Sequence, residues 1–397
     1  MEETQNHAFL GTAPVGKLMC KYAIPCIISL LVAALYNIVD QIFIANADYL
    51  GSYGNAANTA VFPLTVIALA IAVMIGDGAC AFVSISLGRN NKEEAHRSVG
   101  NAILICIVAS ALLTAVYLLA ANPILNAFGG NINQRTMECS QEYFFWITLG
   151  IPFYMFGQAM NPIIRSDGSP KFAMASTLAG AVLNIILDPL FIFVFDMGVT
   201  GAAVASGLGM AVPCIILLKG FLSKDSLLHF SKPQLDWKVM TKTVTNGSSE
   251  FASNLVSGVV MLLFNARMLA IAGSSGVAAS TITFYVFGLM SALYMGYMLG
   301  ISPLLSYAYG AGEHGKLKKI RTISVSFIGI LAISTTILSV LGSKVLVSAF
   351  TEVGSETYLL AVSGNQLFSL ALLFVGFNTF SSMLFTALSN GKISAII

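Results

Sequence analysis

Long apolar segments separated by short polar loops are the feature that most restricts what this chain can fold into. A helix needs about 20 mainly apolar residues to cross a bilayer. Ten segments meet this requirement, and they lie near residues 21–45, 57–87, 98–121, 142–165, 172–195, 199–222, 240–272, 277–307, 321–343 and 356–388. They lack the apolar–polar alternation of a membrane β-strand. The sequence therefore predicts an all-α polytopic membrane protein.

The low charge content agrees with this class. Charged residues make up 10% of the 397 residues, whereas a soluble domain carries roughly 25%. The net charge of +2 gives no indication of a nucleic-acid partner. The polar N-terminus lacks the basic start and cleavage site of a signal peptide, so we expect the first apolar segment to remain as a permanent span.

The distribution of basic residues predicts an orientation. Of the 20 Lys and Arg residues, 17 fall on one side of the ten spans, while Arg135 and Lys344 fall on the other and Arg267 lies within a span. Cytoplasmic loops carry the excess of Lys and Arg in membrane proteins. We therefore expect a multi-pass protein of the cell membrane, in contact with the lipid bilayer, with a cytoplasmic N-terminus.

An internal repeat divides the chain into two halves. GNAANTAVF at 54–62 matches GVAASTITF at 276–284, and LGRNNKEEAHR at 87–97 matches YGAGEHGKLKK at 309–319, both at an offset of 222 residues. We expect a six-helix N-terminal lobe (1–222), a cytoplasmic linker (223–239) and a C-terminal lobe (240–397) related by a parallel repeat. Because the second half holds only four spans, the sequence predicts ten of an expected twelve, with the last two helices missing.

Four carboxylates lie within the predicted spans, where a charged group costs several kcal/mol and is a functional candidate. They are Asp40, Asp77, Asp188 and Glu250. All four histidines fall in cytoplasmic segments, so proton chemistry would have to use carboxylates. Asp77 lies between Gly76 and Gly78, where a close backbone approach and a transport role both fit. Glu250 lies near the cytoplasmic start of the seventh span and could instead be a helix N-terminal charge.

The fifth span, AGAVLNIILDPLFIF, carries Asn184 and Asp188 four residues apart and thus on one helix face. Pro189 cannot donate a backbone hydrogen bond and leaves carbonyl oxygen available nearby. A carboxylate, an amide and a carbonyl on one face suit Na⁺ or a proton. The alternative is a hydrogen-bonded cluster that packs helices around a proline kink.

The first span carries a second polar face after Pro25, formed by Tyr36, Asn37, Asp40 and Gln41. We assign Tyr36, Asn37 and Gln41, together with Glu250, to a substrate cavity. Asn161, which precedes Pro162 near the end of the fourth span, is a weaker signal of the same kind, and a helix-end cap explains it equally well.

Sequence motifs typical of enzymes are either absent or lack the secondary structure that they require. Gly310, Gly312 and Gly315 match G-x-G-x-x-G, but no βαβ unit surrounds them. The sequence contains no H-E-x-x-H or G-x-S-x-G motif. Its six cysteines form no C-x-x-C pair. We therefore expect a protein that is not an enzyme and that binds no cofactor.

Three of these segments resemble the multidrug and toxic compound extrusion (MATE) family over nearly the whole chain. They are LYNIVDQIFI around Asp40, NIILDPLFIF around Asp188 and the GVTGAAVASGLG that follows, with the duplicated loop in support. The resemblance implies a coupling-ion site formed by Asp40, Asn161, Asn184 and Asp188, with Ser206 where relatives often carry Thr. Within it, Na⁺ could bind at Asp40, Asn184 and Asp188.

The resemblance also implies two six-helix lobes around a central cavity, which export organic cations or drugs by antiport with H⁺ or Na⁺ through alternating access. We expect a monomer whose partners are small-molecule substrates. A lipid-linked oligosaccharide or polyisoprenoid flippase remains an alternative, although it would be expected to line its cavity with cations. A non-transporting receptor or scaffold is a further alternative, but it would not need four intramembrane acids.

Overall fold

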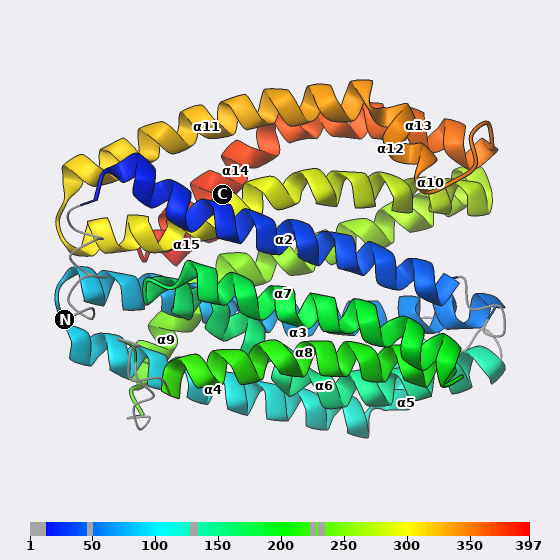
Figure 1. Cartoon of the computed structure of the whole chain (residues 1–397), viewed down its shortest axis with the longest axis horizontal. Helices are drawn as coiled ribbons and strands as arrows, with labels where there is room; N and C mark the ends of the chain where they lie inside the picture. Colours follow the sequence, from blue (N-terminus) through cyan, green and yellow to red (C-terminus); the bar gives the residue numbers. More distant parts are fainter. Residues whose placement is uncertain (1–12, 46–50, 128–133, 223–227, 229–234) are drawn as a thin grey trace.

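The chain is almost wholly helical. The computed structural model describes residues 13–45, 51–127, 134–222, 228 and 235–397, and every regular element in this part of the chain is a helix (Figure 1). The first half contains α2 (Val15–Ala45), α3 (Gly51–Gly88), α4 (Lys92–Leu119), α5 (Ala121–Ala127), α6 (Gln134–Ser166), α7 (Pro170–Pro189), the π-helical turn η1 (Leu190–Val194) and α8 (Gly198–Leu222).

The second half begins with a short helix and continues with a very long one. It contains α9 (Trp237–Asn246), α10 (Ser248–Gly310), α11 (His314–Leu341), α12 (Ser343–Ser348), α13 (Glu356–Phe368), the 3₁₀ turn η2 (Ser369–Ala371), α14 (Leu372–Ala387) and α15 (Gly391–Ile396). The all-α prediction is confirmed.

The ten predicted spans correspond to these helices. Eight helices in the described part of the chain are long and apolar enough to cross a membrane. One of them, α10, has 63 residues and would extend about 95 Å if straight, three times the thickness of a bilayer core. It turns at Ala272 and Gly273, where Gly273 has a φ of +60° that glycine adopts at little cost. Counting α10 twice and adding the less apolar 33-residue α6 accounts for all ten.

Buried apolar side chains form two large clusters. One draws on α3, α4, α6 and α8, so it belongs to the first half of the chain. The other is formed by the second part of α10 with α11 and α14, and it also takes in the start of α2 through Val15, Leu18 and Tyr22. The first turns of α2 therefore pack with the second half, although they precede the predicted division at residue 222.

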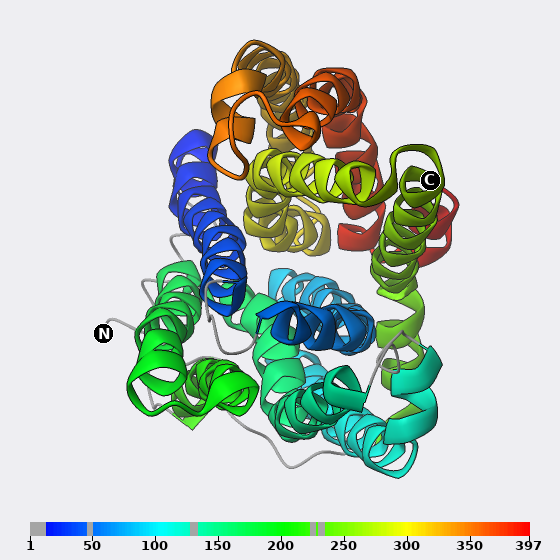
Figure 2. The same ribbon diagram turned by 90° about the vertical axis from the view of Figure 1, so that its right-hand side faces the viewer.

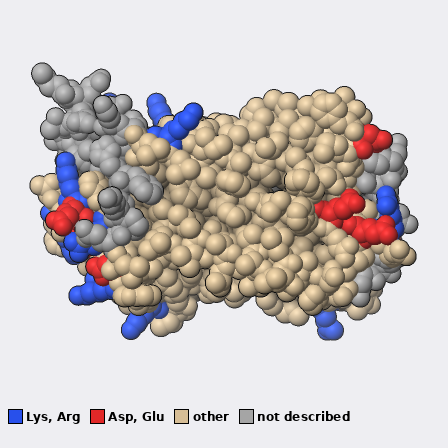
Figure 3. Space-filling view, turned by 90° about the horizontal axis from the view of Figure 1, so that it is seen from below, with Lys and Arg blue, Asp and Glu red and all other residues tan. Residues whose placement is uncertain are grey.

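The helices run roughly parallel to the long axis of the molecule. Viewed from the end that carries α5 and α12, α3 to α8 gather in the lower part and α11 to α14 in the upper part (Figure 2). On the face shown in Figure 3, the central band carries neither acidic nor basic side chains, and most of the visible basic side chains gather at one end. We refer to this end, which includes the α3–α4 turn and the start of α9, as the basic end.

Candidate functional site

A buried carboxylate and amide on α7 form the first candidate site. The Asn184 side-chain nitrogen donates to Asp188 Oδ1 over 3.2 Å. Asp188 is 0% exposed and Asn184 is 3% exposed. Asn184 Oδ1 has no hydrogen-bond partner among the described residues. We call these two residues the α7 pair, and their predicted approach on one helix face is present in the structure.

The backbone next to the α7 pair departs from α-helical geometry. Pro189 ends α7, and the N–H of Leu190 bonds to the carbonyl oxygen of Leu187. The five residues Leu190–Val194 then form a π-helical turn. Such turns are rare and occur frequently at functional sites. The predicted break in regular helix beside Asp188 therefore exists.

Helix α8 packs closely against α7 beside the α7 pair. A Cβ atom on Gly180 would lie 2.6 Å from the carbonyl oxygen of Gly209, so the backbones of α7 and α8 touch. Gly209 also faces Asn184, since its own added Cβ would be 3.1 Å from Asn184 Cβ. Ser206 lies one turn before Gly209 on the same side of α8. Because the two helices run in opposite directions, we expect this turn to lie toward Asp188, and the role of Ser206 stays a prediction.

The polar face of α2 is described only in part. The side chains of Asn37, Asp40 and Gln41 lie outside the described residues. Tyr36 is half-buried and interacts with Tyr154 of α6. Helix α2 packs against α7 and against α10. The assignment of Asp40 to the coupling site, and of the other three residues to a substrate cavity, therefore stays a prediction.

Asn161 is held elsewhere. Its amide donates to the carbonyl oxygen of Ala173, over 3.1 Å, and to Thr177 Oγ1, over 3.3 Å. Thr177 precedes Asp188 by 11 residues, which is about 16 Å along a helix. The structure does not bring Asn161 to the α7 pair, and its contacts are those of a residue that fastens α6 to α7. Its predicted role in ion coupling stays untested.

A second group of charged side chains lies where the two halves meet. Asp77 of α3 and Glu250 of α10 are both partly exposed, and they interact electrostatically with each other. Asp77 also interacts with Arg165, which is only 5% exposed in the last turn of α6. Arg165 is one of the 17 basic residues that the sequence predicts on the cytoplasmic side, and its burial leaves that prediction unchanged. In the sequence, the one nearby feature that pointed to a buried Arg165 was its position four residues, or about one helical turn, after Asn161.

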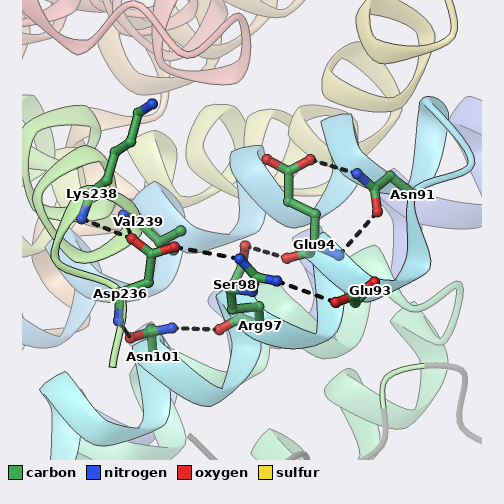
Figure 4. Close-up of polar contacts among 9 residues, drawn as sticks. All are labelled: Asn91, Glu93, Glu94, Arg97, Ser98, Asn101, Asp236, Lys238 and Val239. Atoms are coloured by element: carbon green, nitrogen blue, oxygen red, sulfur yellow. Dashed lines mark hydrogen bonds and ion pairs between the residues drawn. The ribbon is translucent and has the colours of Figure 1, made fainter. Parts of the chain in front are cut away.

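A third polar network joins α9 to the first half at the basic end (Figure 4). Asp236 caps α9 by accepting the N–H groups of Lys238 and Val239, over 3.0 and 3.2 Å. Its own N–H donates to Asn101 Oδ1, and its carboxylate is 3.6 Å from an Arg97 nitrogen. The bond from Val239, then that from Lys238 and the charge of Arg97, lower the pKa of the Asp236 carboxyl.

Ten helical spans around a buried carboxylate, in a chain built as a parallel repeat, define a polytopic membrane protein with the architecture of a secondary transporter. The MatE family model matches residues 25–190 and 250–397. The chain therefore belongs to the MatE family, which confirms the resemblance stated from the sequence.

Individual relatives agree with this assignment. The chain is similar to the multidrug export protein MepA of Staphylococcus saprophyticus, with 25% identity over 385 residues that cover 95% of this chain and 84% of the relative. MepA of Staphylococcus aureus strain MSSA476 is also 25% identical, over 386 residues, with the same coverage of 95% and 84%.

Solved structures show the same fold. The crystal structure of MATE in complex with MaD3S matches with a TM-score of 0.90 and 22% identity, covering 98% of this chain and 86% of that one. The outward-facing conformation of a multidrug resistance MATE family transporter of the MOP superfamily also matches with a TM-score of 0.90, at 23% identity and the same coverage of 98% and 86%.

Proposed function

We propose that this chain is a secondary active transporter that exports drug-like organic cations by antiport with H⁺ or Na⁺. The observation that carries the proposal is the α7 pair, a buried carboxylate and amide beside a π-helical turn in a chain of the MatE family. The relatives named above are multidrug export proteins, which supports transport and favours it over a flippase, a receptor or an enzyme.

The α7 pair would hold the coupling ion, with Ser206 beside it and Asp40 opposite on α2. A carboxylate removed from water is stabilised by a bound cation or proton. Binding would neutralise Asp188 and allow α2 to bend at Pro25, which would close the cavity assigned to Tyr36, Asn37 and Gln41 and release the substrate outward. One charge moving inward gains about 2.3 kcal/mol per 100 mV.

We also propose a cytoplasmic N-terminus, a cell-membrane location and a monomer. The excess of Lys and Arg on one side of the spans supports the orientation. In this orientation the basic end of the molecule faces the cytoplasm, and the end that carries α5 and α12 faces outward.

Replacing Asp188 tests the proposal most directly. The substitution Asp188→Asn keeps the shape of the side chain but removes the charge that attracts the coupling ion. We expect efflux of a fluorescent organic cation from proteoliposomes, driven by a Na⁺ or H⁺ gradient, to fall at least about tenfold, the change produced by losing 1.4 kcal/mol of binding. Applying each gradient alone identifies the ion.

Asn365→Ala is the matched control, because it removes a buried amide of α13, in the other half of the chain, without touching Asp188. It should lower thermal stability while ion-driven efflux per folded molecule persists. Undiminished efflux by Asp188→Asn, at equal protein content, would rule out the α7 pair as the coupling site. Loss of efflux in a folded Asn161→Ala protein would assign Asn161 to that site.

A further inference from the structure

One of the close contacts between the two halves near the basic end is a crossing where α3 meets the junction of α9 and α10. A Cβ atom on Gly78 would overlap the carbonyl oxygen of Thr243, and one on Gly247 would overlap that of Met74. Glycine at both positions is what lets the two backbones come into direct contact. Helices that belong to different halves of the repeat are thus in contact without intervening side chains.

Asp77 and Glu250 flank this crossing from opposite sides. Asp77 follows Gly76, whose added Cβ would lie 2.7 Å from the carbonyl oxygen of Ala159, so α3 is also pressed against α6. Glu250 is three residues beyond Gly247 on α10 and interacts with Asp77. One carboxylate therefore comes from each half, and separating α3 from α10 would move them apart.

Arg165 supplies one positive charge beside this pair. It is 5% exposed, its Nε donates to the carbonyl oxygen of Asn161 over 3.4 Å, and its Nη1 lies 3.7 Å from Cys26 Sγ on α2. It also interacts electrostatically with Asp77. Other titratable side chains near it are the thiols of Cys26 and Cys80. The Tyr22 hydroxyl next to those thiols also interacts with the buried carboxylate of Asp167.

One arginine balances only one of the two carboxylates. With both ionised, the cluster carries a net negative charge, and the two like charges repel each other across the crossing. A single proton makes the cluster neutral. Because Arg165 interacts with Asp77, the proton is held more favourably on Glu250.

We propose that Asp77, Arg165 and Glu250 form a proton-dependent lock between the two halves, which holds the basic end of the transporter closed while Glu250 is protonated. When the halves separate, Asp77 leaves with Arg165 and Glu250 leaves with α10, so both carboxylates become hydrated and ionised. The proton is then released on the side that has opened. Its use in transport rests on the proposed function, but the lock itself does not involve the α7 pair.

Cys26 is a built-in reporter of this lock. Cys26 is 5% exposed and is covered by α10, where a Cβ atom on Gly296 would be 3.0 Å from the Cys26 carbonyl oxygen. Separation of the halves would uncover it. With the other five cysteines replaced by Ser or Ala, the rate of labelling by a membrane-impermeant maleimide in inside-out vesicles measures how often the basic end opens.

The test compares variants at the same pH, which cancels the intrinsic pH dependence of the thiol reaction. At pH 8 we expect Glu250→Gln, which mimics the protonated lock, to be labelled about fivefold more slowly than the parent, the effect of one like-charge repulsion on an equilibrium. At pH 6 the two should agree. Asp77→Asn should behave in the same way, since it too leaves one carboxylate for one arginine.

Glu313→Gln is the control, because Glu313 pairs with Lys316 within one half of the chain. It should follow the parent at both pH values. Equal labelling of the parent, Glu250→Gln and Asp77→Asn at pH 8 would overturn the lock. The assay needs no substrate and no gradient, so adding Asp188→Asn should leave the labelling difference intact. A failure of efflux is thereby distinguished from a failure of the lock.

Discussion

The two halves of the chain touch at the basic end through two crossings that the 222-residue repeat relates to each other. In one, α2 lies on the second part of α10, where a Cβ on Gly300 would be 2.7 Å from Ala23 Cα. In the other, the junction of α9 and α10 lies on α3 at Gly78, which is the repeat partner of Gly300. A third contact is symmetric in itself, since Gly88 meets Tyr307 and its partner Gly310 meets Ile85.

The two crossings differ in chemistry although they share geometry. The start of α2 is held by apolar burial, because Val15, Leu18 and Met19 belong to the core of the second half. The start of α9 is held by polar contacts, through the cap on Asp236 and its ion pair with Arg97. Protons and salt act on charges and hardly on apolar contacts. The α9 crossing is therefore the one that solution conditions can loosen.

Filling the contact at Gly247 should produce the largest effect. Ala fits the Gly247 φ of −88°, so Gly247→Ala introduces no backbone strain and only forces its methyl group into the Met74 carbonyl. Overpacking of this kind costs about 1–3 kcal/mol and occasionally more. We expect a larger fall in thermal stability, and faster labelling of Cys26, than for Gly300→Ala at the other crossing.

Gly288→Ala controls for the change in helix propensity. A Cβ there has no atom within 4 Å, so this substitution should be neutral or slightly stabilising. If Gly247→Ala and Gly288→Ala had equal thermal stability and equal rates of Cys26 labelling, the direct backbone contact at the α9 crossing would be refuted.

The substitution Leu18→Ala tests whether apolar burial holds the start of α2 against the second half of the chain. Leu18 is 5% exposed within the second core, and removing such a side chain costs about 2–5 kcal/mol. Unfolding of the purified protein should show this loss equally at low and high salt. Ile24, on the same helix but 53% exposed, is the matched control, and Ile24→Ala should cost far less. Equal losses for the two variants would mean that α2 is not anchored by this core.

Features that depend on one stretch of sequence could be predicted. Hydropathy located the ten spans, and the spacing of Asn184 and Asp188 placed them on one face because four residues make about one helical turn. The repeat even pairs Gly78 with Gly300. What each of these glycines touches could not be predicted, because the contact lies in a distant helix.

Features that depend on partners far away in sequence were missed. The burial of Arg165 was not predicted, since it follows from contacts such as that with Cys26, 139 residues earlier. The separation of α9 from α10 at Gly247 was also missed, since residues 240–272 were predicted as a single span. Asn161 is the opposite case. The sequence suggested a functional polar residue, but its amide donates a hydrogen bond to the carbonyl oxygen of Ala173 on the neighbouring helix α7.

Removing the charge of Asp236 should produce the smallest effect and the one most dependent on solution conditions. Asp236→Asn keeps an oxygen that can cap α9 but loses the ion pair with Arg97. We expect faster hydrogen exchange of the Lys238 and Val239 amides at neutral pH, and little difference at 1 M salt, where charges are screened within about 3 Å.

The pH dependence has a defined sign. The Val239 and Lys238 N–H groups and Arg97 lower the pKa of Asp236 in the folded chain. The stabilisation that ionised Asp236 gives to the folded chain is therefore complete at pH values above the ordinary pKa of aspartate. It is lost as the pH falls through the lowered pKa of the folded chain. Protection of α9 should thus decline in acid in the parent and stay flat in Asp236→Asn. Glu93→Gln, which removes the other partner of Arg97 without touching α9, should follow the parent. If Asp236→Asn matched the parent at low salt and neutral pH, α9 would be held by its buried face instead, and the contrast between a polar and an apolar crossing would fail.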